Sequence, residues 1–261
     1  MDLSAQRALA RLVASLRRDG RQQSGLDPSL VPPDATTAYR IAAMAAEELG
    51  WDVIGWKIAA TNEEMRRALR TDSPIYGRVY AGCIAASPYT VARATLCSPI
   101  PEVEYQVRLG ADLPVREKPY TVEEVTDAVA SLHPGLELAE CRFIHDAAFP
   151  PLPAILADGA GCGTLIPGPA IADWRNRDIA GQEVTLSSNG TIRRRGTAAA
   201  ALEHPMVSLT WLANELSRTG IGMKAGQMIS TGTMTGMLAP KPGETFVADF
   251  GPFGSVTLIV T

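Results

Sequence analysis

The segment from Glu102 to Leu109 alternates strictly between polar and apolar side chains. Its apolar positions are Val103, Tyr105, Val107 and Leu109. A period of two predicts a β-strand with one face on a core, because successive side chains point to opposite sides. On such a strand the Cα atoms of Glu102 and Glu104 lie about 6.6 to 7 Å apart, so both carboxylates can converge on one cation. Gln106 and Arg108 share their face, which equally fits a solvated strand surface.

Glu137 adds a third carboxylate in an unusual setting. It lies between Leu136 and Leu138 in an apolar segment that reads as a short strand over Leu136–Ala139. An unpaired carboxylate is costly to bury there, and three clustered carboxylates repel one another unless a cation neutralises them. The chain has only three histidines, and its four cysteines form no C-x-x-C pair. Oxygen ligands without histidine favour Mg²⁺ or Mn²⁺ over Zn²⁺.

Lys57 stands inside a predicted buried strand, Asp52–Ile58. A lysine between apolar neighbours usually needs an anionic partner or a ligand. The alternative is a lysine at the sheet edge whose ammonium reaches water. A second candidate binding element is the hydroxyl-rich run Ile229–Gly236, whose amides and hydroxyls could hold a carboxylate. Such a run is also typical of a plain loop.

Bulk composition excludes several classes of function. The chain of 261 residues has a net charge of −4 and its longest basic run is Arg193-Arg194-Arg195, so we expect no nucleic-acid partner. No apolar run approaches the roughly 20 residues that span a bilayer, and arginines interrupt the apolar stretches at the N-terminus. We therefore expect a cytoplasmic protein without a membrane partner. The glycine-rich run 157–163 lacks the spacing of a dinucleotide site.

The order of elements predicts an α+β fold. Residues 1–72 read as a small, mainly helical N-terminal region, and residues 73–261 as a β-rich catalytic domain. Thr121 and Glu124 form a capping box that predicts a helix to about Leu132. Further along, the patterns predict a hairpin turn, a helix and two strands. These elements fall at Ser188–Thr191, Pro205–Gly220, Thr245–Asp249 and Ser255–Val260.

Several segments, taken in order, resemble the 2-keto-4-pentenoate hydratase branch of the fumarylacetoacetate hydrolase superfamily. The matching segments are Gly55-Trp56-Lys57-Ile58-Ala59-Ala60-Thr61, Asp72-Ser73-Pro74-Ile75-Tyr76-Gly77-Arg78, Glu102-Val103-Glu104-Tyr105, Leu132-His133-Pro134-Gly135-Leu136-Glu137, Ala157-Asp158, His204-Pro205, Ser230-Thr231-Gly232-Thr233 and Asp249-Phe250-Gly251. They cover most of the chain, in the order and with the spacing that the family shows. Each match alone is weak, whereas the ordered set is specific.

The resemblance implies a mixed β-roll that binds Mg²⁺ or Mn²⁺ through Glu102, Glu104 and Glu137. It places the family's lysine at Lys57 and its substrate-binding turn at Thr231-Gly232-Thr233. The implied activity is hydration of a 2-hydroxy-2,4-dienoate or its 2-oxo-4-enoate tautomer, as in aromatic-compound degradation. We expect a homo-oligomer whose partner is this small 2-oxo acid or dienoate.

The chain departs from the family at one chemically important position. Hydratases of this group often carry an acidic residue, implicated in proton transfer, directly after the proline that matches Pro74. Ile75 stands there, and Asp72 is the nearest acidic candidate for the catalytic role. Decarboxylation of a 2-oxo acid or C–C cleavage of an acylpyruvate at the same site therefore remain alternatives. A further alternative is a non-catalytic binding or partner subunit.

Overall fold

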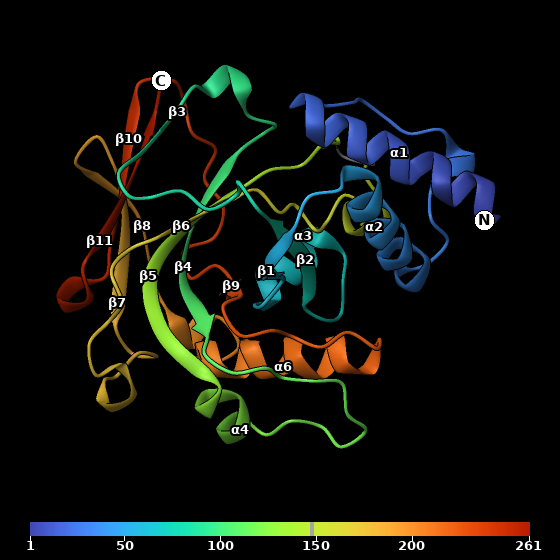
Figure 1. Cartoon of the computed structure of the whole chain (residues 1–261). Helices are drawn as coiled ribbons and strands as arrows, with labels where there is room; N and C mark the ends of the chain where they lie inside the picture. Colours follow the sequence, from blue (N-terminus) through green and yellow to red (C-terminus); the bar gives the residue numbers. More distant parts are fainter. Residues whose placement is uncertain (147–148) are drawn as a thin grey trace.

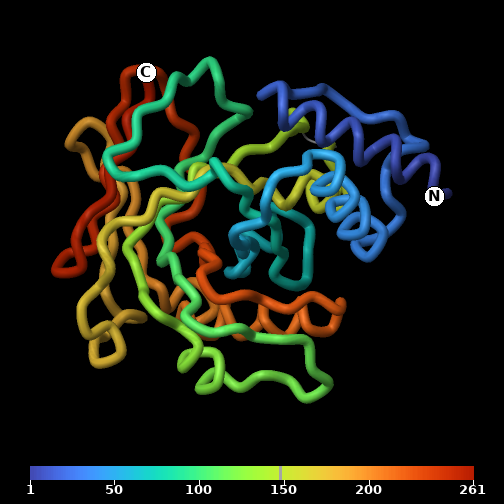
Figure 2. The backbone as a smooth tube through the Cα atoms, in the orientation of Figure 1, coloured from blue at the N-terminus to red at the C-terminus, as the bar shows by residue number. Residues whose placement is uncertain are grey.

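A computed structural model describes residues 1–146 and 149–261. The N-terminal part is a pair of packed helices, α1 (Leu3–Asp19) and α2 (Ala35–Leu49), with the short α5 (Leu152–Ala157) against α2. Asp2 and Asp34 cap the first turns of α1 and α2, and both helices end at glycines in the left-handed conformation. Figure 2 shows these helices on the side of the molecule away from the C-terminal strands.

A six-stranded mixed sheet forms the centre of the molecule. Its order is β2-β1-β9-β4-β5-β6, with β1 parallel to β9 and all other neighbours antiparallel. The strands are β1 (Val53–Ala59), β2 (Ile75–Tyr80), β4 (Ile100–Leu109), β5 (Val129–Ala139), β6 (Thr164–Pro167) and β9 (Met228–Ser230). The short helix α3 (Glu63–Leu69) connects β1 to β2. Figure 1 shows β4 and β5 as the long, curved pair of this sheet.

A five-stranded sheet in the order β3-β11-β10-β7-β8 packs against the first. Its strands are β3 (Tyr89–Val91), β7 (Glu183–Ser188), β8 (Thr191–Thr197), β10 (Glu244–Asp249) and β11 (Ser255–Val260). Inward-facing residues of both sheets share one apolar core, in which the rings of Tyr105 and Phe250 meet at 5.2 Å. Helices α4 (Val122–Asp127) and α6 (Pro205–Arg218) contact each other and complete this core. The α+β fold class is therefore confirmed.

Short 3₁₀ helices interrupt the connections between these elements. They lie at Pro28–Leu30, Arg93–Thr95, Trp174–Asn176, Ala198–Ala200 and Gly251–Phe253. No helix in residues 1–146 or 149–261 combines the length and the apolar character needed to cross a membrane.

Two adjacent predicted elements are wrong in their extent, the helix to about Leu132 and the short strand over Leu136–Ala139. The Thr121–Glu124 capping box is present, but the helix it begins ends at Asp127 rather than near Leu132. Residues from Val129 onward belong to β5, which pairs with β4 along nearly its whole length. Cross-strand pairing and burial of Val129 and Leu132 outweigh the local helix signal.

The sheet also crosses the expected domain boundary at residue 72. β1 precedes that residue and β2 follows it, and the two strands pair along their length. The division into residues 1–72 and 73–261 remains a prediction about domains. Within the first region, β1 lies between the helices α2 and α3.

Candidate active site

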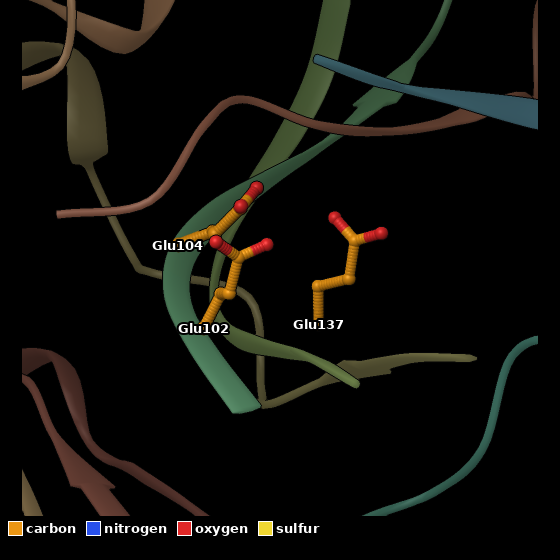
Figure 3. Close-up of side chains that lie close together, drawn as sticks. All are labelled: Glu102, Glu104 and Glu137. Atoms are coloured by element: carbon orange, nitrogen blue, oxygen red, sulfur yellow. The ribbon is translucent and has the colours of Figure 1, made fainter. Parts of the chain in front are cut away.

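Three carboxylates converge at the junction of β4 and β5. Glu102 and Glu104 lie on one face of β4, and Glu137 lies on β5 directly opposite Glu102 in the strand register. One carboxylate oxygen from each residue lies within 4.8 Å of those of the other two. The three residues are 6%, 1% and 0% exposed. Figure 3 shows their carboxylates gathered around one point, as the strand periodicity of Glu102 and Glu104 predicts.

Hydrogen bonds from β9 and the turn after it hold the Glu104 carboxylate. Ser230 Oγ donates to Glu104 Oε2 at 2.5 Å, and the Gly232 amide donates to the same oxygen at 2.8 Å. Gly232 has a φ of +111°, and a Cβ there would lie 2.4 Å from a side-chain carbon of Thr61. Glycine is therefore required for this amide to reach the carboxylate.

Glu137 is buried with an ion-pair partner but without hydrogen bonds from the part of the chain that the structure describes. Within the described residues, no group donates a hydrogen bond of normal geometry to either of its oxygens, although both are fully buried. Its nearest cation is Lys57, whose Nζ lies 3.6 Å from Oε1. A buried carboxylate without hydrogen bonds is costly and rare in folded proteins.

Lys57 is buried with the carboxylates rather than reaching water. It lies on β1 opposite Ser230 of β9, and its side chain is 2% exposed. When all three carboxylates are ionised, they and this one ammonium leave two negative charges uncompensated. A divalent cation supplies the charge that balances them, and oxygen ligands suit hard cations such as Mg²⁺. The residues present therefore fit a divalent metal ion.

Burial dominates the electrostatics of the cluster. It raises the pKa of Glu102 to about 7, while Lys57 acts to lower that pKa and Glu137 to raise it. Burial and the two neighbouring carboxylates raise the pKa of Glu104 well above its usual value. Burial also raises the pKa of Glu137. Lys57 and the Gly163 amide act to lower that pKa, although neither makes a hydrogen bond of normal geometry with the carboxylate. For Lys57, burial alone would lower the pKa, but the three carboxylates together raise it.

A cavity of about 310 Å³ opens beside Lys57 and Glu102. Its walls come from β1, α3, β4, β5 and α5, from the segment before β4, and from the segments that follow β5, α5 and β9. Most of the lining is apolar, and it includes Met65, Leu69, Ile100, Ala139, Ile155 and Met237. The cavity gives a small organic molecule access to the edge of the carboxylate cluster.

Asp72 lies apart from the carboxylate cluster and from the cavity beside Lys57. It is exposed after the end of α3, where it lines a separate shallow depression with Glu63, Arg66 and Arg70. Ile75 is buried on β2 and does not line the cavity beside Lys57. The catalytic role expected of Asp72 therefore has no support from its position.

The predicted substrate-binding turn, Thr231-Gly232-Thr233, lies beside the cluster. Some of its hydrogen-bond donors already bind other protein groups. The Thr231 hydroxyl donates to the Tyr105 carbonyl at 2.8 Å, and the Gly232 amide is committed to Glu104. Thr233 is buried, and its hydroxyl oxygen has only a long contact of 3.4 Å from the Thr235 amide. Of the three residues, Thr233 has the hydroxyl most available for a ligand.

Sequence reasoning missed two residues that line the cavity, Cys141 and His145. His145 Nε2 lies 3.2 Å from Cys141 Sγ, and both residues line the cavity. The sequence contained a signal for Cys141. If the alternation of the strand is continued past Ala139, Cys141 falls on the same face as Glu137. His145 follows in an irregular segment, where no periodicity indicates a direction.

Curated relatives align with nearly the whole chain. The 2-keto-4-pentenoate hydratase of Paraburkholderia xenovorans (strain LB400) is 31% identical over 88% of this chain and 84% of its own length. The enzyme of the same name from Burkholderia vietnamiensis is 28% identical over 99% of this chain and its full length. A 4-oxalocrotonate decarboxylase of Pseudomonas putida is 27% identical over 88% of this chain and 86% of its own length.

A solved structure shares the fold over the whole chain. The 4-oxalocrotonate decarboxylase from Pseudomonas putida G7, complexed with magnesium and adipate, superposes with a TM-score of 0.90 at 23% identity. The superposition covers 100% of this chain and 99% of that structure. The model of the fumarylacetoacetate (FAA) hydrolase C-terminal domain matches residues 85–261, which include all three clustered carboxylates. This chain belongs to the fumarylacetoacetate hydrolase family.

Proposed function

We propose that this protein is a divalent-metal-dependent lyase that hydrates a 2-hydroxy-2,4-dienoate, or its 2-oxo-4-enoate tautomer, in the degradation of aromatic compounds. The observation that carries the proposal is the fully buried Glu137, which has Lys57 3.6 Å away and two further carboxylates beside it. The names of the curated relatives, which include several 2-keto-4-pentenoate hydratases, support the reaction class.

In this proposal Glu102, Glu104 and Glu137 hold Mg²⁺ or Mn²⁺. A cation bound there would supply Lewis-acid stabilisation of negative charge that develops on the 2-oxygen of the substrate. Solved structures of the decarboxylase from Pseudomonas putida G7 contain magnesium in one case and calcium in another, which supports a hard divalent cation.

The chain's own residues would orient the substrate and stabilise its charge. The Lys57 ammonium is fixed beside Glu137 in a buried site, where a positive charge interacts with a developing anion more strongly than in water. The Thr233 hydroxyl would bind the substrate carboxylate, and its one weak contact, 3.4 Å from the Thr235 amide, supports this role. Ser230 and Gly232 orient Glu104 and leave its second oxygen free for a ligand.

Decarboxylation of a 2-oxo acid is the second candidate, and a specific observation favours it. Hydration needs a group that moves a proton near the distal carbons of the substrate. Ile75 is apolar, and Asp72 is exposed outside the cavity, so neither supplies that group. Relatives with both names align with this chain, and hydration remains the first candidate because most of those relatives are hydratases.

A substrate panel separates these candidates. The full chain with Mg²⁺ or Mn²⁺ is incubated with 2-hydroxydienoates and 2-oxo acids, and products are identified by mass. Hydration adds one water, whereas decarboxylation removes CO₂. Loss of all turnover after chelation is expected for either reaction. Retention of the metal without any turnover would contradict both and would indicate a non-catalytic binding protein.

We also propose a cytoplasmic homo-oligomer. Analytical ultracentrifugation of the purified chain tests the oligomeric state, and a single species at 27.7 kDa would contradict it.

A further inference from the structure

The cavity beside the carboxylate cluster has mainly apolar walls, with a few polar side chains: Lys57, Ser98, Glu102, Glu140 and His145. Lys57 and Glu102 mark the end of the cavity that meets the carboxylate cluster. Away from that end, Met65 and Leu69 of α3 face the cavity together with Ile100, Ala139 and Ile155. Its volume of about 310 Å³ is at the lower limit for sites that enclose small ligands. A substrate whose 2-oxo acid group binds at the carboxylates therefore places its tail among apolar side chains.

The charged residues that line the cavity offer little to pair with a second carboxylate on the substrate. Among the described residues that line it, Lys57 is the one permanent cation, and Glu137 lies 3.6 Å from its Nζ. Glu140 also lines the cavity, and as an acidic residue it would repel a second carboxylate on the substrate. Its Oε1 already accepts a hydrogen bond from the Cys97 amide.

The remaining titratable groups of the lining do not supply a positive charge at neutral pH. Burial lowers the pKa of His145, so its neutral form dominates, even though Asp158 acts to raise that pKa and Arg70 lowers it further. Burial keeps Cys141 a neutral thiol. Arg66 on α3 and Arg70 directly after it make hydrogen bonds away from the cavity. Arg66 donates to the Ala60 carbonyl and Arg70 to the Pro150 carbonyl, and both line the separate depression that contains Asp72.

We infer that the substrate is a 2-oxo monoacid with an uncharged hydrocarbon tail, and that the chain discriminates against substrates with a second, terminal carboxylate. This inference rests on the proposed function and narrows its substrate class. A terminal carboxylate would lose its hydration in the apolar part of the cavity without gaining a cationic partner, which is costly. A hydrocarbon tail of the same shape gains from burial against the same walls.

Binding of a shape-matched pair of ligands tests the inference without turnover. We would titrate the Mg²⁺-loaded full chain at pH 7.5 with 6-methyl-2-oxoheptanoate and with 2-oxoadipate, by calorimetry. The isopropyl end of the first ligand has nearly the shape of the terminal carboxylate of the second. The monoacid should bind at least about tenfold more tightly, because the buried carboxylate remains unpaired. Equal or tighter binding of 2-oxoadipate would overturn the inference while leaving the proposed function intact. Failure of both ligands to bind would instead contradict the proposed function.

A charge-insertion variant tests the cause of the preference. Leu69 is half-buried on α3 and faces the cavity, so Leu69→Lys places an ammonium near the substrate tail, and Leu69→Met is the neutral control of similar length. The lysine variant should shift the ratio of the two Kd values toward 2-oxoadipate by about tenfold, and the methionine variant should keep the preference of the wild type. Met237, which is 42% exposed at the cavity, offers a second pair, Met237→Lys and Met237→Leu, if the first does not fold. An unchanged ratio in a folded lysine variant would overturn the charge-based explanation.

Discussion

Glu102 and Glu137 stand directly opposite each other on antiparallel strands β4 and β5, and both are almost completely buried. Like charges at such positions destabilise a sheet. Lys57, 3.6 Å from Glu137, compensates only one of the negative charges that the cluster carries when ionised. A protein retains this arrangement at a cost to its stability, which is typical of a site built for a ligand rather than for folding.

Glu137→Gln should abolish binding of the divalent cation while leaving the metal-free protein at least as stable as the wild type. The amide removes a buried charge that lacks hydrogen bonds, so relief of repulsion offsets the loss of the ion pair with Lys57. Thermal unfolding with and without Mg²⁺ measures both effects. The wild type should gain about 2.7 kcal/mol at a Mg²⁺ concentration 100 times Kd, and the variant should gain nothing. Glu117→Gln, at an exposed glutamate, is the control that should behave as the wild type. Unchanged stabilisation of Glu137→Gln by Mg²⁺ would remove this residue from the metal site.

Lys57→Met should lower kcat/KM by roughly 10²-fold, because it removes a fixed positive charge from the place where the substrate becomes more negative. Methionine has a similar length and fills the same buried space, so folding should survive the change. Affinity for Mg²⁺ should rise at the same time, since a competing cation has left the cluster. Steady-state kinetics and a Mg²⁺ titration measure the two effects. Lys224→Met, at an exposed lysine paired with Asp112, is the matched control. Normal turnover in Lys57→Met would leave this lysine with only a structural role.

Ser230→Ala should weaken Mg²⁺ binding by about 10-fold, because residues that orient a metal ligand typically contribute 10- to 100-fold in affinity. The hydroxyl of Ser230 donates to Glu104 at 2.5 Å, and without it the carboxylate keeps only the Gly232 amide. Calorimetric titration with Mg²⁺ gives the affinity. Ser208→Ala alters another buried serine, on α6, whose hydroxyl donates to the Ala201 carbonyl, and should leave the affinity unchanged. Equal affinities of the two variants would contradict the orienting role of Ser230.

The metal-free protein should lose stability as pH rises from about 4.5 to above 7. The pKa of Glu102 is raised to about 7 in the folded state, so over this range the folded state holds a proton that the unfolded state has released. Stability then falls with pH by up to about 1.4 kcal/mol per unit for each such group. Affinity for Mg²⁺ should change in the opposite direction and rise with pH, because the cation displaces that proton. Urea unfolding between pH 5 and 8, without and with Mg²⁺, measures both slopes. If the stability of the metal-free protein instead increased with pH over this range, the folded state would not hold the extra proton, and the raised pKa of Glu102 would be wrong.

Asp72→Asn should retain turnover within about twofold, because an exposed substitution away from the site rarely has larger effects. The side chain is exposed and lines a depression separate from the cavity beside Lys57. Hydration and tautomerisation of the same dienol should be followed separately. Loss of hydration with normal tautomerisation would mean that α3 moves when substrate binds and carries Asp72 into the site.

The sequence by itself determined the local features on which the site is built. Period-two alternation placed Glu102 and Glu104 on one face of β4, because neighbouring side chains of a strand necessarily diverge. Thr121 marked the first turn of α4, because a cap depends only on atoms within three residues. Glu137 stood out by its apolar neighbours along the chain. The family resemblance grouped it with Glu102 and Glu104 as a metal ligand, because no local rule supplies its cross-strand position.

Only the tertiary structure decided which distant groups share the site. Ser230 is 126 residues from Glu104, yet its hydroxyl holds that carboxylate, because β9 inserts between β1 and β4. The same packing buried Lys57, extended β5 through residues that favour a helix locally, and left Asp72 in solvent. The apolar character of the cavity likewise arises from α3, β4, β5 and later segments together. Periodicity and capping report only neighbours along the chain, whereas burial and charge in this site depend on strands brought together from across the sequence.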